Sequence, residues 1–135
     1  MSDTNTKNIL CIDDDRFLLD MYALKFVKAG YQVKTSDSTE AALKMLKDNY
    51  IPDVILCDIV MPGMDGLGLI EEIRKQNLVP KTAIIMLTNQ SSSDDIARAK
   101  KLNIDGYIVK ATTIPSEVLT EVEKILSTKS LNNNL

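Results

Sequence analysis

Five polar side chains stand directly after short apolar runs of this sequence, and together they could carry phosphoryl chemistry. They are Asp13, Asp14, Asp58, Thr88 and Lys110. Three carboxylates held close together repel one another, and such a cluster is tolerated when a hard divalent cation neutralises it or when one group stays protonated. An all-oxygen site suits Mg²⁺, which keeps several waters and accepts one or two carboxylates together with a phosphate oxygen. The cluster would then supply a nucleophilic carboxylate, a metal, and donors for the charge on a transferring phosphoryl group.

The elements that would position these side chains are repeated strand and helix units. Short apolar runs alternate with amphipathic stretches, which is typical of five βα units on a parallel sheet. The predicted strands are 8–12, 31–35, 54–57, 82–87 and 106–109, the second of them weaker and suited to a sheet edge. The predicted helices are 16–29, one that begins after Ser38, 67–76, a short polar helix capped from 91–95, and 114–126. Ligand sites in open α/β sheets lie outside the carboxyl ends of the strands, so the five polar side chains should share one edge.

The first predicted helix carries apolar residues at helical spacing, namely Phe17, Leu18, Met21, Leu24 and Val27. This spacing predicts one apolar face turned toward the sheet, and Gly30 supplies a stop. Asp13 and Asp14 could merely cap this helix, but one cap needs one carboxylate and Asp15 is also available. The pair therefore favours a functional site.

The composition fits one ordinary globular domain. The chain has 135 residues, of which 44% are hydrophobic and 26% charged, and a domain of this size buries about two-thirds of its unfolded surface. The net charge of −3 argues against nucleic-acid binding, and no apolar stretch reaches the roughly 18 residues of a membrane span. Cys11 and Cys57 lie inside apolar runs and are predicted to be buried, reduced thiols. We expect a cytoplasmic protein with its domain over 7–128 and flexible tails at 1–6 and 129–135.

The chain contains no histidine. This absence removes every histidine-based triad and metal site, and it means that the protein cannot form its own phosphohistidine. If phosphoryl transfer occurs, the donor must be another molecule.

The ordered motifs resemble the CheY-like receiver domain of bacterial two-component response regulators, over 7–126. The matching segments are ILCIDD at 9–14, VILCD at 54–58, MPGMDG at 61–66, IIMLT at 84–88 and GYIVK at 106–110. Each segment alone is a weak signal, whereas their ordered spacing is strong. The resemblance implies a single doubly wound, five-stranded parallel sheet of order 2-1-3-4-5 with five helices, the flavodoxin- and CheY-like α/β fold.

Carried over residue by residue, the resemblance implies a phosphoacceptor and metal site. Asp58 would accept the phosphoryl group, Asp14 would ligate Mg²⁺ directly, and Asp13 would act mostly through metal-bound water. The backbone carbonyl of Val60 would complete the metal site.

The resemblance also implies a switch and its partners. Thr88 would hydrogen-bond the phosphoryl group, Lys110 would pair with it, and Tyr107 matches the switch aromatic whose ring turns inward as the threonine moves. The donor would be a sensor histidine kinase or a histidine phosphotransfer protein. The target would dock on the face formed by the fourth helix, the fifth strand and the fifth helix. Because no output domain is seen, we expect a single-domain effector or phosphorelay intermediate, monomeric or weakly dimeric on phosphorylation, rather than an enzyme acting on other substrates.

Several positions depart from the family pattern. Ala111 follows Lys110 where the family usually has a cis proline, and a non-proline cis bond costs about 2.5 to 4 kcal/mol, so a trans bond and a differently set loop are expected. Asn89 replaces a small residue and could narrow access or donate to the phosphoryl group. Val60 and Gln90 flank the expected path of attacking water, and Val60 cannot orient that water, which predicts slow self-dephosphorylation.

The same residues also bear on three alternative functions. A haloacid-dehalogenase-type phosphatase would use Asp13-x-Asp15, but its late acidic motif should follow the lysine, whereas Asp58 precedes Lys110. A flavodoxin-like FMN binder needs a hydroxyl-rich phosphate loop where this chain has three aspartates. A pseudo-receiver, which binds partners without being phosphorylated, would carry the same residues around an altered Lys110 loop.

Overall fold

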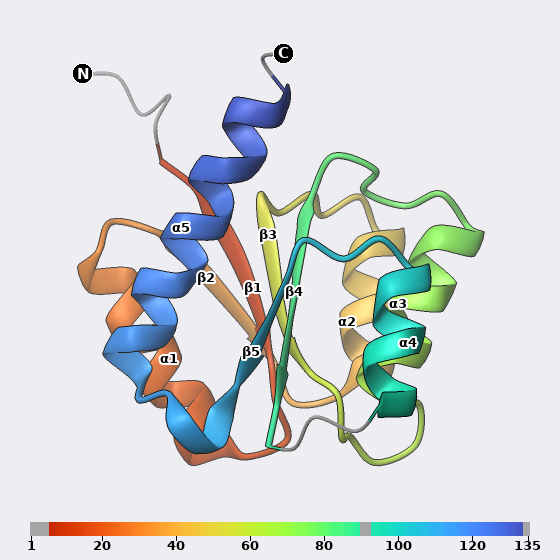
Figure 1. The fold of residues 1–135 in the computed structure, drawn as a ribbon, viewed down its shortest axis with the longest axis horizontal. Helices are drawn as coiled ribbons and strands as arrows, with labels where there is room; N and C mark the ends of the chain where they lie inside the picture. Colours follow the sequence, from red (N-terminus) through yellow and green to blue (C-terminus); the bar gives the residue numbers. More distant parts are fainter. Residues whose placement is uncertain (1–5, 90–92, 134–135) are drawn as a thin grey trace.

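The chain folds into one parallel sheet covered by helices on both faces (Figure 1). The computed structural model describes residues 6–89 and 93–133. The elements in chain order are β1 (Asn8–Ile12), α1 (Arg16–Lys28), β2 (Gln32–Ser36), α2 (Thr39–Lys47), β3 (Val54–Asp58), α3 (Gly66–Lys75), β4 (Ala83–Thr88), α4 (Ser93–Lys101), β5 (Gly106–Val109), a 3₁₀ turn (Lys110–Thr112) and α5 (Pro115–Asn133). The five strands lie in the order β2-β1-β3-β4-β5, which confirms the predicted fold.

The apolar strands form the centre of the molecule because both of their faces are covered. Helices α1 and α5 lie against one face, and α2, α3 and α4 lie against the other (Figure 1). Every residue of β3 and β4 is buried, whereas β2 lies at an edge and is mostly exposed, as its weaker pattern predicts. Cys11 and Cys57 are buried free thiols that belong to opposite faces of the sheet, and burial raises the pKa of Cys11 to about 12. The prediction of two buried thiols without a disulfide is confirmed.

The buried face of α1 differs from the prediction. The structure buries Leu19, Tyr22 and Phe26, while Phe17, Leu24 and Val27 are 73%, 51% and 57% exposed. Apolar residues occur around most of this helix, so its sequence contains two stripes with helical spacing. Only docking against the sheet and α5 decides which stripe is buried, and the exposed stripe is left for other contacts.

Helix α5 is longer than predicted. The expected end was Leu126, but the helix continues to Asn133 and so includes much of the segment predicted to be a tail. Lys129 forms an ion pair of 3.2 Å with Asp105, which ties this extension to the loop before β5. The remaining parts of the predicted tails, 1–5 and 134–135, lie outside the described residues, as do Gln90, Ser91 and Ser92.

Within the described part of the chain, none of the helices is both long enough and apolar enough to cross a membrane.

Candidate functional site

The carboxyl ends of the strands lie at the lower end of the sheet in Figure 1. Residues at or just after the ends of β1, β3, β4 and β5 line a cavity of about 330 Å³. Its lining residues are Asp13, Asp14, Asp15, Leu18, Asp58, Val60, Asn89 and Lys110. Most of the residues predicted for the site therefore meet in one place, although Asp13 and Lys110 are 97 positions apart in the sequence. The parallel topology causes this convergence, because successive strands all end at the same edge.

Three carboxylates form the acidic part of the site. Oxygens of Asp13, Asp14 and Asp58 lie within 4.8 Å of one another. Asp13 and Asp58 are buried, and Asp14 is exposed toward the open side. A buried group of like charges is costly unless cations compensate it, so this geometry fits a divalent cation at the open side.

Asp15 has a different role from its two neighbours. Its carboxylate accepts hydrogen bonds from the backbone N–H groups of Phe17 and Leu18 at 3.1 and 3.2 Å, which makes it the N-cap of α1. The interpretation of Asp13 and Asp14 as caps is thereby removed. A phosphatase that needs Asp13 and Asp15 as a catalytic pair is also disfavoured, because the Asp15 carboxylate already caps the helix.

Lys110 supplies a buried positive charge between two of the carboxylates. Its Nζ donates to Asp13 Oδ2 at 2.7 Å and to Asp58 Oδ2 at 3.2 Å, and the lysine side chain is only 6% exposed. One ammonium group offsets one of the three negative charges, which leaves the cluster acidic. Loss of this lysine would leave buried carboxylates without their partner, which typically costs several kcal/mol.

The backbone that carries Lys110 is held by hydroxyl groups. All described peptide bonds are trans, as predicted for the bond to Ala111, and the chain forms a 3₁₀ turn over Lys110–Thr112. The hydroxyl of Thr113 donates to the carbonyl of Val109 at 2.8 Å, and its N–H donates to the carbonyl of Lys110 at 3.2 Å. These local bonds set the direction of the chain where the family usually has proline.

The charges in the site shift the pKa of Asp58 upward. Burial is the main cause, Lys110 opposes the shift, and Asp13 reinforces it. For Lys110, burial alone would lower the pKa, but the hydrogen bond to Asp13 and the charges of Asp58 and Asp13 outweigh it and raise the pKa. Ionised Asp58 is thus disfavoured in the folded metal-free protein, whereas protonated Lys110 is favoured.

We expect Asp58→Asn to stabilise the metal-free protein at neutral pH. Folding raises the pKa of Asp58, so ionised Asp58 lowers the free energy of unfolding of the natural chain. This loss is absent at pH values below the ordinary aspartate pKa and complete at pH values above the raised pKa. The unfolding free energy of the variant minus that of the natural chain should therefore grow as pH rises through this window. Urea unfolding in the presence of a chelator, repeated from acidic to neutral pH, measures this difference. A difference that shrinks with rising pH would contradict the prediction.

Thr88 and Tyr107 lie at the far side of the site. Thr88 ends β4 and is buried, opposite Val109 in the sheet register. The ring of Tyr107 packs against the core cluster beneath α2, α3 and α4, and its hydroxyl is buried beside Thr88. Burial raises the pKa of this hydroxyl, and the neighbouring Thr88 opposes the rise. The two residues predicted for the switch are thus neighbours, although neither is among the residues that line the acidic cavity.

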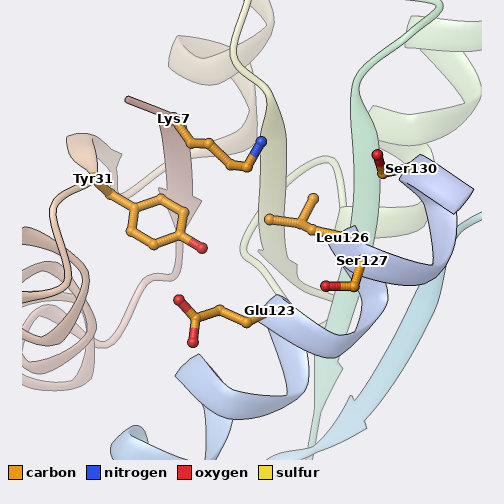
Figure 2. Close-up of a pocket in the computed structure, with 6 residues that line it drawn as sticks. All are labelled: Lys7, Tyr31, Glu123, Leu126, Ser127 and Ser130. Atoms are coloured by element: carbon orange, nitrogen blue, oxygen red, sulfur yellow. The ribbon is translucent and has the colours of Figure 1, made fainter. Parts of the chain in front are cut away.

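A larger cavity, of about 620 Å³, lies away from the acidic cluster (Figure 2). Its lining residues are Lys7, Tyr31, Glu123, Leu126, Ser127 and Ser130. Ser127 and Ser130 lie on α5 beyond residue 126, where the helix is predicted to end, and the sequence therefore does not predict this cavity. The labelled side chains in Figure 2 include one cation and one carboxylate but no cluster of like charges, and so they lack the chemistry of the strand-end site.

The fold and the strand-end cluster together define the class of receiver domains. The model of the family described as "Response regulator receiver domain" matches residues 9–123, and the chain belongs to this family. It is thus a receiver domain of a response regulator, the phosphoacceptor module of two-component signalling.

Relatives by sequence are longer proteins. The chain is 34% identical over 132 residues to a "Probable transcriptional regulator ycf27" of Porphyridium aerugineum, covering 96% of this chain and 53% of the relative. It is 30% identical over 120 residues to the "Phosphate regulon transcriptional regulatory protein PhoB" of Pseudomonas aeruginosa, covering 89% of this chain and 52% of that protein. The chain spans about half the length of these curated relatives.

Solved structures show the same fold. A CheY-like response regulator receiver domain protein from Methanospirillum hungatei superposes with a TM-score of 0.84 at 27% identity, covering 94% of this chain and 98% of that one. The chemotaxis protein CheY4 of Vibrio cholerae superposes with a TM-score of 0.81 at 28% identity, covering 89% of this chain and 98% of that one.

Proposed function

We propose that this receiver domain is a Mg²⁺-dependent switch in which Asp58 accepts a phosphoryl group from a histidine of another protein. The observation that carries the proposal is the position of Asp58, which is 5% exposed, lies 3.2 Å from the Lys110 ammonium and has two further carboxylates within 4.8 Å. In the transfer, an oxygen of Asp58 bonds to phosphorus as the bond from phosphorus to the donor nitrogen breaks, and the nitrogen keeps the electron pair. The direct test is phosphorylation by acetyl phosphate with and without Asp58.

The donor set favours Mg²⁺ as the resident cation. Asp14, Asp58 and the backbone carbonyl of Val60 would hold the ion, with Asp13 acting through water. When bound, the ion gathers phosphoryl oxygens and neutralises charge that the carboxylates would otherwise repel. The Val60 main chain also acts on Asp58, because burial raises the pKa of the Asp58 carboxyl and the Val60 N–H offsets part of that rise.

Lys110, Thr88 and Tyr107 would convert phosphorylation into a change of surface. The Lys110 ammonium can exchange a carboxylate partner for a phosphoryl oxygen, since its Nζ already reaches Asp58. The Thr88 hydroxyl would donate a hydrogen bond to the same phosphoryl group, and the neighbouring Tyr107 ring would change position as Thr88 moves. This would couple the site to the face of α4, β5 and α5. A mostly apolar cavity of about 280 Å³ at α4 and β5 includes Tyr107, Ile96 and Ala99. We propose that the downstream protein docks there.

Exposed apolar residues near the acidic cavity support a protein donor. Val60 lines the cavity and is largely exposed, and Phe17 precedes the lining residue Leu18 by one position. Ile114, shortly after Lys110, is exposed as well. Such side chains suit a docked sensor kinase or phosphotransfer protein, which would exclude water during transfer. We further propose a cytoplasmic location and a monomer that dimerises weakly, if at all, on phosphorylation.

We expect the phosphorylated form to hydrolyse slowly. The side chain beside the attacking-water path is Val60, which has no group that can orient water, and the second predicted flanking residue, Gln90, lies outside the described residues. Loss of phosphate after removal of acetyl phosphate, followed by intact-protein mass spectrometry, measures the lifetime. Replacement of Val60 by Gln should shorten it, because the amide can position water. A natural lifetime of seconds or less would contradict this prediction.

A further inference from the structure

Met64, in the loop between β3 and α3, has both of its main-chain polar groups bonded to side chains of α2. The hydroxyl of Thr39 donates to the carbonyl of Met64 at 2.5 Å, and the N–H of Met64 donates to the carboxylate of Glu40 at 3.2 Å. Thr39 is 0% exposed. Two consecutive side chains thus hydrogen-bond the main chain of Met64, which lies 25 positions after Thr39 and 24 after Glu40.

Neither side chain is needed to cap its own helix. Ser38 is the N-cap of α2, and its hydroxyl accepts from the N–H of Ala41 at 3.1 Å. A buried hydroxyl such as that of Thr39 is costly unless it is hydrogen-bonded, and here its bond goes to another loop. The hydrogen bonds from its own backbone and from Met64 lower the pKa of Glu40, so Glu40 is ionised at neutral pH.

The same loop is also held where it begins and ends. The N–H of Gly66 donates to the carbonyl of Ile59 at 2.7 Å, which closes the base of the loop. At the tip, Gly63 has φ +72°, and a Cβ there would lie 2.8 Å from Oε2 of Glu40. Val60 lies between Ile59, which is bonded to Gly66, and Met64, which is bonded to α2, and so its main chain has little freedom to move.

We propose that Thr39 and Glu40 are positioning residues that hold the Val60 main chain ready for a divalent cation before the ion binds. This inference rests on the proposed function, because it assigns the carbonyl of Val60 to the metal site. A metal ligand that is fixed before the ion binds raises the affinity for the metal, because no binding free energy is then lost in ordering the loop. The prediction concerns metal affinity, whereas the phosphoacceptor Asp58 stays in place on β3.

The test compares Thr39→Val with Thr39→Ser. Valine has nearly the same shape but no hydroxyl, and serine restores the hydroxyl. Calorimetric titration with Mg²⁺ should show a dissociation constant raised about 10-fold or more for Thr39→Val, the size typical of residues behind a metal ligand. Thr39→Ser should stay close to the natural chain. Amide hydrogen exchange at Met64 and Val60 should accelerate in Thr39→Val but not in Thr39→Ser. The extent of labelling by acetyl phosphate at saturating Mg²⁺ should stay close to that of the natural chain.

Glu40 provides a second variant that leaves the core intact, because its side chain is exposed. Glu40→Ala removes the acceptor and the charge, whereas Glu40→Gln keeps an acceptor oxygen and removes only the charge. We expect weaker Mg²⁺ binding for Glu40→Ala than for Glu40→Gln.

Some outcomes would overturn the inference. Unchanged Mg²⁺ affinity and loop exchange in Thr39→Val and Glu40→Ala, with or without lost stability, would show that the contacts are only structural. A natural chain without Mg²⁺ affinity would also overturn it. A natural chain that binds Mg²⁺ but neither gains phosphate nor binds beryllofluoride would refute the proposed function, while the ratio of dissociation constants would still decide the role of Thr39.

Discussion

Asp58→Asn is expected to abolish the gain of one phosphate that we expect of the natural chain with acetyl phosphate and Mg²⁺. The amide of asparagine has the same shape as the carboxylate but is not a nucleophile, and it supplies one fewer charged oxygen to a cation. Asp58 lies at the carboxyl end of β3, and intact-protein mass spectrometry detects the added group directly. Asp53→Asn is a matched control, because Asp53 precedes the opposite end of the same strand, where it bonds the N–H of Asn8 at 2.7 Å. That control should be labelled normally.

The same experiment separates a working switch from a pseudo-receiver. Labelling of Asp58→Asn at the natural level would place the acceptor elsewhere and refute the assignment. If the natural chain gains no phosphate, binding of beryllofluoride with Mg²⁺ distinguishes slow chemistry from an incompetent site. Failure of both would identify a domain that acts by contact alone.

Gly66→Ala is expected to cause the largest loss of stability of any small substitution near the site. A Cβ at this position would overlap the backbone carbonyl oxygen of Asp58 and lie 2.9 Å from its carbonyl carbon. Backbone atoms of a buried strand cannot turn aside, so β3 or the start of α3 must shift, at a cost of about 3 kcal/mol or more. Against a typical total of 5 to 15 kcal/mol this is a large fraction, and urea unfolding measures it.

Gly106→Ala is the control for this prediction. A Cβ at Gly106 would meet the side chain of Ile125, which can change rotamer, so we expect a loss of only about 1 kcal/mol. Equal losses for the two variants would mean that the Asp58 backbone is free to move. The Gly66 variant should also lose Mg²⁺ affinity, because Gly66 ends the loop that carries Val60 and bonds back to Ile59 at its start.

The sequence by itself determined the fold and most of the site. Strands of continuous apolar residues have to be covered on both faces, and parallel strands all end at one edge. The residues at the carboxyl ends of β1, β3 and β5 can therefore be assigned to one cavity from the sequence, and Asp13, Asp58 and Lys110 do meet there.

Tertiary structure alone decided which of several compatible local patterns is used. Helix α1 has two stripes with helical spacing, and only its docking against the sheet buries Phe26 and exposes Leu24. The hydrogen bond from Thr39 to Met64 joins segments 25 positions apart, and neither segment carries a local sequence pattern that predicts it. Periodicity and strand order report on which residues face inward along one element or share one edge, whereas contacts between loops depend on how separate elements pack in three dimensions.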